Sequence, residues 1–481
     1  MAEEVWMLQT KKADFKQIGA RFRIDPVTAR IIRNRGIEGE AAIDRYLNGT
    51  LDDLYDPMLL KDMERAVSIL CEAVDTGKKI RIVGDYDIDG VCSTYILLQA
   101  FERLGSDVDF EIPDRIKDGY GINESIIEQA HADGVEVILT CDNGISAFHQ
   151  VELAKKYGMT VVITDHHEVP LDGEKEKIPP ADAVIDPKQA DCPYPFPEIC
   201  GAVVAYKLVQ VLYARRGVPQ MEWLDLLEFA AIATVGDVMK LQDENRILVK
   251  YGLKKMAQTK NLGLRRLAEK NNLDLGAITA YHIGFVIGPC LNAGGRLKTA
   301  KEALALLRAQ SEEEAERLAE ELKELNDTRK DMTEQGTEAA KLQVESWYQK
   351  DKVLVVFLPE CHESLAGIIA GRLREYYQKP AIVLTRGEEA VKGSGRSIDE
   401  YHMFKKADRG QRSAAQNFGG HPLAAGLSLE EKNIDEFRRR LNENAGLTEE
   451  DFKAKVWIDV PMPVGYVTER LVRELSCLEP F

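Results

Sequence analysis

The chain has 481 residues and a formal net charge of -17, and 44% of its residues are hydrophobic and 30% charged. This length predicts two to four domains, because one hydrophobic core seldom extends beyond about 250 to 300 residues. The charge argues against binding of nucleic acid through bulk basicity, although a local groove with a few arginines can still hold a phosphodiester chain. No apolar run approaches the roughly 18 residues that a membrane span needs, so we expect no membrane partner.

The composition also predicts the compartment. The first residues, MAEEVW, lack a basic region followed by an apolar core, so we expect no secretory signal and a cytoplasmic location. The eight cysteines form no CxxC pair, and the nearest two, Cys192 and Cys200, lie in a Pro-rich stretch. We therefore expect free thiols rather than a zinc site or a disulfide framework.

Residues 1–75 are predicted to form an N-terminal helical extension, with breaks at IDP (24–26) and DP (56–57). From residue 76 to about 310 the pattern alternates between strands and helices. Strands are predicted at residues 80–83, 108–112, 135–141, 160–164 and 183–185, and helices at 91–104, 125–132 and 147–157. This alternation predicts an α/β domain in which helices cover both faces of a parallel sheet.

The sequence GDYDIDG, at residues 84–90, directly follows the first of these strands. Ligands of open α/β sheets bind at the carboxyl ends of the strands, and alternate residues of an extended backbone point the same way. Asp85, Asp87 and Asp89 can therefore converge. Because like charges so close destabilise a site without a cation, a divalent metal ion is the simplest explanation. The alternative is an acidic turn that caps the following helix.

Further acidic and imidazole groups follow other elements of the same domain. Asp142 begins DNG after the third predicted strand, Asp165, His166 and His167 follow the fourth, and Asp237 follows an apolar helix. Each has a structural alternative when taken singly: a turn, a structural histidine or a helix C-cap. Together they complete a two-metal shell of carboxylate oxygens and an imidazole nitrogen, which suits Mn²⁺ well and Mg²⁺ adequately. This shell consists of Asp87, Asp89, Asp142, His166 and Asp237.

Residues 311–349 are predicted to form one long connecting helix. Apolar residues recur there at three- and four-residue steps from Ala315 to Leu325. The spacing continues only weakly beyond Leu325, which favours a connecting helix over the alternative, a coiled-coil dimer.

A second, smaller α/β domain is predicted at residues 350–447, with strands at 353–357 and 381–384 and a helix at 365–377. It contains GSGRS at residues 393–397. Small residues let a backbone approach a phosphate closely, a serine hydroxyl can donate a hydrogen bond, and an arginine can hold two phosphate oxygens. The alternative for this motif is a tight turn.

In order and spacing, these motifs resemble those of the DHH phosphoesterase superfamily. The matching motifs are DYDIDG at 85–90, DNG at 142–144, DHH at 165–167 and GD at 236–237. Further motifs resemble the RecJ branch, whose members are single-strand-specific DNA exonucleases. These are IPDR at 112–115 with GYG at 119–121, GPCLNAGGRL at 288–297, GSGRS at 393–397 and GGHPLAAG at 419–426. The resemblance covers roughly residues 15–480 and implies a DHH catalytic domain at 76–310 and a DHH-associated substrate-binding domain at 350–447.

The resemblance also implies roles for single residues. Two metal ions are expected about 3.5–4 Å apart, with Asp142 bridging them. The implied metal ligands are Asp85, Asp87, Asp89, Asp142, His166 and Asp237. The implied catalytic set is Asp87, Asp89, Asp142, Asp165, His166, His167 and Asp237. The implied substrate-binding residues are Arg115, Tyr120, Asn292, Arg296, Ser394, Arg396, Gly420 and His421. Of these, the arginines and GSGRS are expected to hold a terminal 5′ phosphate, Gly420 and His421 to lie near the scissile phosphate, and Tyr120 to stack on a base.

In the family that this chain resembles, residues 448–481 would begin an oligonucleotide-binding β-barrel, and we expect a strand at 456–460 and an amphipathic helix at 466–478. One strand and one helix cannot close a five-stranded barrel, so we expect this incomplete segment to be poorly anchored or to pack elsewhere. We also expect weaker binding of single-stranded DNA than in a relative with the whole barrel.

The leading hypothesis is a metal-dependent 5′ to 3′ exonuclease that degrades single-stranded DNA to mononucleotides in recombination and repair. The direction of attack comes from the resemblance. We expect a monomer that works with a single-strand-binding protein and a helicase. One alternative is a DHH phosphodiesterase of nanoRNA, pAp or cyclic dinucleotides. Another is a catalytically inactive DNA-binding protein, which the presence of all five proposed ligands argues against.

Overall fold

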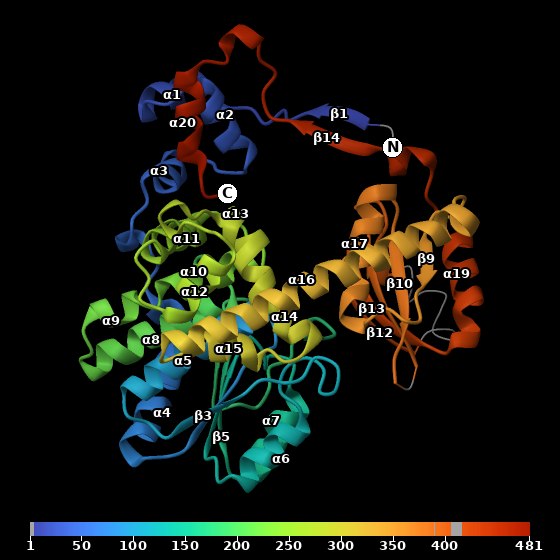
Figure 1. The fold of residues 1–481 in the computed structure, drawn as a ribbon. Helices are drawn as coiled ribbons and strands as arrows, with labels where there is room; N and C mark the ends of the chain where they lie inside the picture. Colours follow the sequence, from blue (N-terminus) through green and yellow to red (C-terminus); the bar gives the residue numbers. More distant parts are fainter. Residues whose placement is uncertain (1–3, 389, 406–415) are drawn as a thin grey trace. The chain divides into compact units, whose positions relative to one another are not determined.

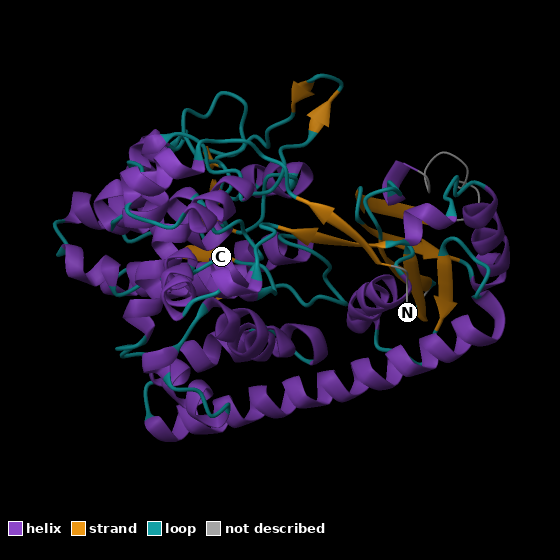
Figure 2. Cartoon of the chain, turned by 90° about the horizontal axis from the view of Figure 1, so that it is seen from above, coloured by secondary structure: helices purple, strands orange, loops and turns teal. Residues whose placement is uncertain are grey.

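The structure, a computed structural model, describes residues 4–388, 390–405 and 416–481 (Figure 1). The chain divides into a large unit, Lys12–Asn326 with Pro463–Phe481, and a small unit, Met1–Lys11 with Asp327–Met462. A long helix, α16 (Glu312–Gln343), lies where the connecting helix is predicted. It spans the sequence boundary between the units and is continuous in Figure 2.

The large unit is built on a five-stranded parallel sheet with the strand order β3-β2-β4-β5-β8. The strands are β2 (Ile80–Val83), β3 (Val108–Glu111), β4 (Val137–Cys141), β5 (Thr160–Thr164) and β8 (Ala183–Ile185). All five predicted strands are thereby confirmed. Val83 pairs with Glu111 and Thr140, and Cys141 pairs with Thr164. The carboxyl ends of these strands therefore lie along one edge of the sheet.

Helices cover both faces of this sheet, as the alternating pattern predicts (Figure 1). In β4, Val137 and Leu139 belong to one hydrophobic core and Ile138 belongs to the other, because successive side chains of a strand point to opposite faces. The first core includes residues of α4 (Met63–Thr76), α5 (Ile88–Arg103), α8 (Gly201–Arg216) and α10 (Leu227–Gly236). The second includes residues of α6 (Glu124–Ala132) and α7 (Phe148–Lys156).

The remaining elements of the large unit are mostly helical. They include α9 (Gln220–Leu224), α11 (Asp243–Met256), α12 (Leu262–Lys270), α13 (Ala280–His282), α14 (Gly288–Leu297), α15 (Lys301–Leu307) and the hairpin of β6 (Leu171–Asp172) and β7 (Lys175–Glu176). The N-terminal helices are α1 (Phe15–Phe22), α2 (Pro26–Asn34) and α3 (Glu40–Asn48). The predicted break at IDP is confirmed, because the Asp25 carboxylate caps α2 by accepting a hydrogen bond from Val27 N.

The residues expected to begin a barrel are divided between the two units. In the small unit, β14 (Ala454–Ile458) pairs in parallel with β1 (Glu4–Leu8), a strand that the sequence pattern did not reveal. In the large unit, α20 (Glu469–Leu475) and the residues after it pack against the N-terminal helices, and Leu478 shares a core with Tyr46. Of the two expectations for this segment, packing elsewhere is confirmed for residues 463–481. That a barrel begins here remains a prediction.

Arg246 on α11 fastens the C-terminal turn of the large unit. The side chain is 2% exposed, and its guanidinium donates hydrogen bonds to the carbonyl oxygens of Tyr46 (2.8 Å), Cys477 (2.8 Å), Leu478 (2.9 Å) and Glu479 (3.0 Å). Carbonyl oxygens of two distant segments thus satisfy one buried cation, which compensates for the removal of its charge from water.

The small unit contains the second predicted α/β domain. Its five-stranded sheet has the order β12-β13-β11-β10-β9, in which only β9 and β10 are parallel. The strands are β9 (Leu354–Phe357), β10 (Ala381–Arg386), β11 (Val391–Arg396), β12 (Gln416–His421) and β13 (Ala424–Leu429). Separate cores contain residues of α17 (Ala366–Tyr377) and α19 (Ile434–Glu443). The predicted strands at 353–357 and 381–384 and the helix at 365–377 are confirmed.

The GSGRS motif lies in a strand, so its interpretation as a tight turn is wrong. Residues 393–396 belong to β11, which has β10 on one side and β13 on the other. A Cβ atom at Gly395 would lie 2.3 Å from Met403 Sδ, and one at Gly393 would lie 2.6 Å from Leu384 Cδ2. Both glycines are thus required by packing against neighbouring side chains rather than by a turn.

Two expectations from composition can be compared with the structure. All eight cysteines are free thiols, as expected. Among the described residues, no helix has both the length and the apolar character needed to cross a membrane.

Candidate metal centre

The GDYDIDG segment carries its three carboxylates from the end of β2 into the first turn of α5. Asp87 is the N-cap of α5 and accepts hydrogen bonds from Asp89 N (2.9 Å) and Gly90 N (3.1 Å). The helix-cap alternative is therefore correct for Asp87, but it does not replace the metal hypothesis. The Asp85 carboxylate is 1% exposed and accepts a hydrogen bond from Gly121 N at 3.3 Å.

Asp89 links α5 to the beginning of α8. Its two carboxylate oxygens accept hydrogen bonds from Gly201 N and Ala202 N, both at 2.7 Å. These amides lie in the first turn of α8 and have no hydrogen-bond partner within the helix. The helix dipole also favours a negative charge at this end. This contact fixes Asp89 at the sheet edge although the side chain is almost completely buried.

Asp142 occupies the centre of the strand edge. It follows β4 with a backbone φ of 60°, an uncommon value for a residue other than glycine, and it is 2% exposed. A Cβ atom on Gly201 would lie 2.7 Å from the Cβ of Asp142, so Gly201 allows α8 to begin directly against this residue.

His166, which follows β5, lies close to carboxylates that follow β4 and α10 and to one in the first turn of α5. Its Nε2 lies 3.1 Å from Asp142 Oδ1, 3.4 Å from Asp89 Oδ2 and 3.8 Å from Asp237 Oδ2. Asp237 is the C-cap of α10, so its structural alternative is also correct, yet its carboxylate faces the histidine.

Three overlapping groups of side chains can each hold a metal ion. They are Asp85, Asp87 and Asp142; Asp89, His166 and Asp237; and Asp142, His166 and His167. Within each group the potential ligand atoms lie within 4.8 Å of one another. The structure thus brings all six predicted metal ligands together, and Asp142 belongs to two of the groups.

The electrostatics of the cluster match a site for divalent cations. Burial, together with repulsion from Asp87, raises the pKa of Asp85 to about 8. Burial, together with repulsion from Asp89, raises the pKa of Asp237 to about 8. Burial also raises the pKa of Asp142, and its Oδ1 accepts no hydrogen bond from the described residues. These oxygens therefore fit hard divalent ions, which bind carboxylates and remove the mutual repulsion.

Asp165 holds the loop that carries both histidines. Its Oδ1 accepts hydrogen bonds from His166 N (2.7 Å) and His167 Nδ1 (2.7 Å), and its Oδ2 accepts one from Ile145 N (2.9 Å). Burial alone would raise the pKa of Asp165, but its hydrogen bond to His167 and the charge of that imidazole lower it overall. Asp165 therefore orients His167, whose ring lies beside Asp142.

Tyr120 contacts the cluster through its hydroxyl. This group donates a hydrogen bond to the backbone oxygen of Asp142 (2.8 Å) and lies 3.1 Å from the His167 ring nitrogens. The tyrosine is 52% exposed, so its ring remains accessible for the predicted stacking on a base. Its hydroxyl also supports the backbone of Asp142, which the sequence did not predict.

Arg115 and Arg296 line one small pocket of about 40 Å³ together with Tyr86. The Arg115 guanidinium lies over the Tyr86 ring, 4.7 Å from its centroid. Asn292 and Arg296 both lie on α14, which approaches this pocket closely because a Cβ atom on Gly295 would lie 2.3 Å from Tyr86 O. Arg115 and Arg296 thus lie at one pocket. That GSGRS joins them in holding a terminal phosphate stays a prediction.

The other predicted substrate-binding residues lie in the small unit. Arg396 Nη1 donates hydrogen bonds to Gly395 O (2.8 Å) and Ser394 Oγ (3.3 Å). Gly420 and His421 belong to β12, but their side-chain environment lies outside the described residues.

The sequence interpretation missed two residues beside the cluster, Asp186 and Tyr86. Asp186 directly follows β8, so the strand-end rule that found Asp142 also applies to it. Burial, with repulsion from Asp165, raises the pKa of Asp186 to about 7, and its Oδ2 has no hydrogen-bond partner among the described residues. The sequence did not point to a role for Tyr86, because the motif was interpreted through the carboxylates of Asp85 and Asp87.

Two models of protein families match separate parts of the chain. The model of the DHH family, N-terminal domain, matches residues 79–234, and that of the DHHA1 domain matches residues 350–446.

Several known proteins are similar over most of the chain. The single-stranded-DNA-specific exonuclease RecJ of Bacillus subtilis is 37% identical over 99% of this chain and 60% of the relative. RecJ of Haemophilus influenzae is 34% identical over 92% of this chain and 79% of the relative. The crystal structure of RecJ from Thermus thermophilus in complex with Mn²⁺ superposes with a TM-score of 0.84, at 29% identity, over 99% of this chain and 67% of that chain. The chain thus spans 60% of the length of the Bacillus subtilis relative.

Proposed function

Since this chain belongs to the RecJ family of single-stranded-DNA-specific exonucleases, we propose that it hydrolyses single-stranded DNA from the 5′ end with the help of divalent metal ions. The observation that carries the proposal is the cluster of buried carboxylates and imidazole at the edge of the parallel sheet. The products would be mononucleotides, formed in DNA recombination and repair.

We assign the metal ions to the side chains that converge on Asp142. The holding residues are Asp85, Asp87, Asp89, Asp142, His166 and Asp237. When bound, Mn²⁺ or Mg²⁺ supplies Lewis-acid stabilisation of negative charge and a source of activated water. A serine or cysteine nucleophile is then not needed for the reaction.

The protein itself contributes position and charge. Asp165 fixes His167 through the 2.7 Å hydrogen bond, and we assign His167 a contact with the substrate phosphate. Tyr120 holds the backbone of Asp142 and presents its ring to a base. A rigidly held set of groups lowers the barrier because little reorganisation is needed during the reaction.

Recognition of the substrate end is assigned to arginine. We propose that Arg115 and Arg296 bind the terminal 5′ phosphate, because a guanidinium can donate two parallel hydrogen bonds to phosphate oxygens. Asn292, Ser394, Arg396, Gly420 and His421 are assigned to the substrate path on the resemblance of their motifs.

The wider setting is also proposed rather than observed. We propose that the protein acts in the cytoplasm as a monomer, and that a helicase and a single-strand-binding protein supply and protect its DNA strand. The negative net charge of -17 means that binding depends on local arginines rather than on a broad basic surface.

A competition between substrates tests the proposed substrate class. A labelled long single strand, the matching blunt duplex and a dinucleotide are incubated with the protein and Mn²⁺, and initial rates are compared. We expect the long single strand to be degraded fastest, and the Asp142→Ala variant to degrade none of the three. Preferred cleavage of the dinucleotide would instead support a phosphodiesterase of short substrates.

A further inference from the structure

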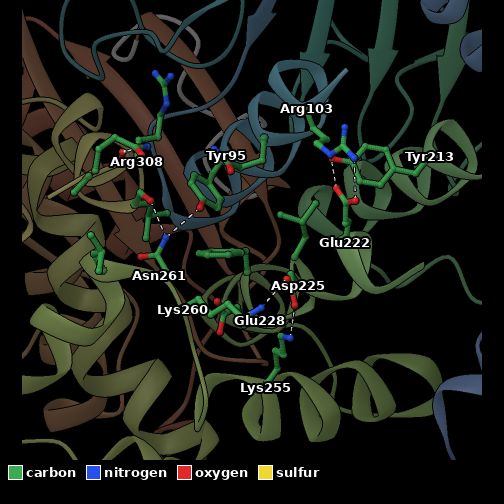
Figure 3. A pocket seen from close by; sticks show the side chains of 17 residues that line it. Tyr95, Arg103, Tyr213, Glu222, Asp225, Glu228, Lys255, Lys260, Asn261 and Arg308 are labelled. Atoms are coloured by element: carbon green, nitrogen blue, oxygen red, sulfur yellow. Dashed lines mark hydrogen bonds and ion pairs between the residues drawn. The ribbon is translucent and has the colours of Figure 1, made fainter. Parts of the chain in front are cut away.

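A second polar cavity lies in the large unit, outside the candidate metal centre. Its volume is about 390 Å³, which lies in the range of small-molecule sites. It is lined by residues of α5, α8, α9, α10, α11, α12 and α15 and of the loops beside them, and none of the candidate metal ligands is among them (Figure 3).

The cavity contains a buried carboxylate that is only partly satisfied. Glu228, in the first turn of α10, is 3% exposed, and its Oε1 accepts a hydrogen bond from Thr259 Oγ1 at 2.7 Å. Its Oε2 is buried and has no hydrogen-bond partner within the part of the chain that the structure describes. A buried carboxylate oxygen without a donor costs free energy, so the site favours a ligand that brings a donor.

A hydroxyl and an aromatic wall lie beside this carboxylate. Tyr95 Oη accepts a hydrogen bond from Asn261 Nδ2 (3.1 Å), which leaves its own proton to donate. The Tyr95 and Phe229 rings pack with their centroids 4.4 Å apart and both line the cavity. A flat, partly apolar ring system of a ligand can therefore pack against these two rings beside Glu228.

Cationic side chains surround the same cavity. Figure 3 shows Arg103, Lys255, Lys260 and Arg308 around the Tyr95 and Glu228 side chains. Each pairs with an acidic side chain: Arg103 with Glu222, Arg308 with Glu102, and both lysines with Asp225. Surface ion pairs of this kind are weak, so their cations can exchange partners for a bound anion.

A ligand with two adjacent N–H donors at one end and an anionic group at the other would match these features, with one donor on the unsatisfied Oε2 and the other on Oε1. The N1–H and the 2-amino group of guanine form such a donor pair. Adenine and cytosine place an unprotonated ring nitrogen beside their amino group, which a carboxylate repels. A guanidinium also offers paired donors, but it brings no anionic group for the four neighbouring cations.

We propose that this cavity binds a guanine nucleotide, with the base on Glu228 and against the Tyr95 and Phe229 rings, and the phosphate on the surrounding cations. The site is separate from the candidate metal centre and does not depend on the proposed exonuclease activity.

Titration calorimetry with guanosine monophosphate tests the site. A chelator removes divalent ions, so that the nucleotide cannot bind at the candidate metal centre through a metal ion. We expect saturable binding with one site, and binding of adenosine monophosphate that is weaker by about tenfold or more. In Glu228→Gln the affinity for guanosine monophosphate should fall by about tenfold or more, because the amide replaces an acceptor with a donor.

Glu128→Gln is the control, because this exposed glutamate on α6 undergoes the same chemical change outside the cavity. We expect it to change the affinity by less than about threefold. A thermal melt of each variant establishes that it is folded, and Tyr95→Phe provides a second variant that removes only a hydroxyl.

Four results would overturn the proposal. One is equal binding of guanosine and adenosine monophosphate. Another is binding of guanosine monophosphate that neither Glu228→Gln nor Tyr95→Phe weakens. The third is the absence of saturable binding. The fourth is inorganic phosphate alone binding as tightly as the nucleotide.

Discussion

Asp142 combines an unfavourable backbone conformation with a buried carboxylate in the candidate metal centre. The residue has a left-handed backbone, is 2% exposed, and presents an oxygen that accepts no hydrogen bond from the described residues. Such an arrangement lowers stability unless a ligand compensates for it. We infer that part of the folding free energy is given up here to prepare a cation site.

Replacement of Asp142 by Asn should separate stability from metal binding. Mn²⁺ should raise the melting temperature of the unmodified protein, because a ligand that binds only the folded state adds about 2.7 kcal/mol at 100 times its Kd. In Asp142→Asn this increase should disappear, whereas the melting temperature in chelator should equal or exceed that of the unmodified protein, because a buried charge is removed. Differential scanning fluorimetry with and without Mn²⁺ measures both effects.

The exposed Asp172→Asn in the β6–β7 hairpin is the control for this measurement. It should keep the full increase with Mn²⁺. An Asp142→Asn protein that is stabilised by Mn²⁺ as strongly as the unmodified protein would contradict the assignment of Asp142.

Much of the candidate site could be predicted from the sequence because its residues follow a simple rule. Asp85, Asp142 and His166 all come shortly after a buried strand, and parallel strands end at one edge. Asp237 follows a helix instead, so the strand-end rule does not cover it, and the sequence places it in the shell only in combination with the other candidate ligands. The second role of Tyr120 could not be predicted, because a hydrogen bond to the backbone of Asp142 depends on tertiary packing.

At the scale of single elements, β11 shows where local sequence rules fail. Glycine and serine are typical of turns, yet GSGR forms a strand inside the sheet of the small unit. The reason is steric: side chains from β10, β13 and Met403 fill the space where Cβ atoms of Gly393 and Gly395 would lie. Such crowding comes from residues distant in sequence, so a local pattern does not reveal it.

Two glycine substitutions in this sheet should have opposite effects. Gly395→Ala should lower the free energy of unfolding by about 1–3 kcal/mol, because its Cβ would lie 2.3 Å from Met403 Sδ. Gly426→Ala in β13 should be neutral or stabilising by up to about 1 kcal/mol, since no atom of the described residues lies within 4 Å of its Cβ position. Urea denaturation of both variants measures the difference, and equal destabilisation would contradict the steric explanation.

The edge of the large sheet provides a pH-dependent test. Arg81 on β2 donates two hydrogen bonds to the Asp109 carboxylate on β3, at 2.7 and 2.8 Å. Burial alone would raise the pKa of Asp109, but these hydrogen bonds and the charge of Arg81 lower it overall. A lowered pKa means that the ionised carboxylate stabilises the folded state above its unfolded pKa of about 4, and that this contribution is lost as the pH falls.

Asp109→Asn should therefore destabilise the protein at pH 7 by about 1 kcal/mol, a small value because the carboxylate is 33% exposed. The difference between variant and unmodified protein should shrink as the pH falls below about 4. Urea midpoints across this pH range measure it. A difference that grows toward acidic pH would have the wrong sign for this ion pair.

At the scale of the whole molecule, the chain joins segments that are far apart in the sequence. β1 pairs with β14, so that Glu4 lies opposite Ala454, and Arg246 binds carbonyl oxygens of both Tyr46 and the C-terminal turn. The five strands of the large sheet and two strands of the small sheet, β9 and β10, could be predicted from the sequence pattern. The division of residues 448–481 between two units could not be predicted, because it depends on these long-range contacts.

The central claim, attack on single-stranded DNA from the 5′ end, is tested most directly with one doubly labelled strand. A 5′-phosphorylated oligonucleotide carries one dye at the 5′-terminal nucleotide and another at the 3′ end, and products are separated by length at early times in Mn²⁺. We predict that the 5′ dye is released first as a mononucleotide while the 3′ dye remains on strands that shorten progressively. Early release of the 3′ dye, with the 5′ dye retained on long fragments, would contradict the account.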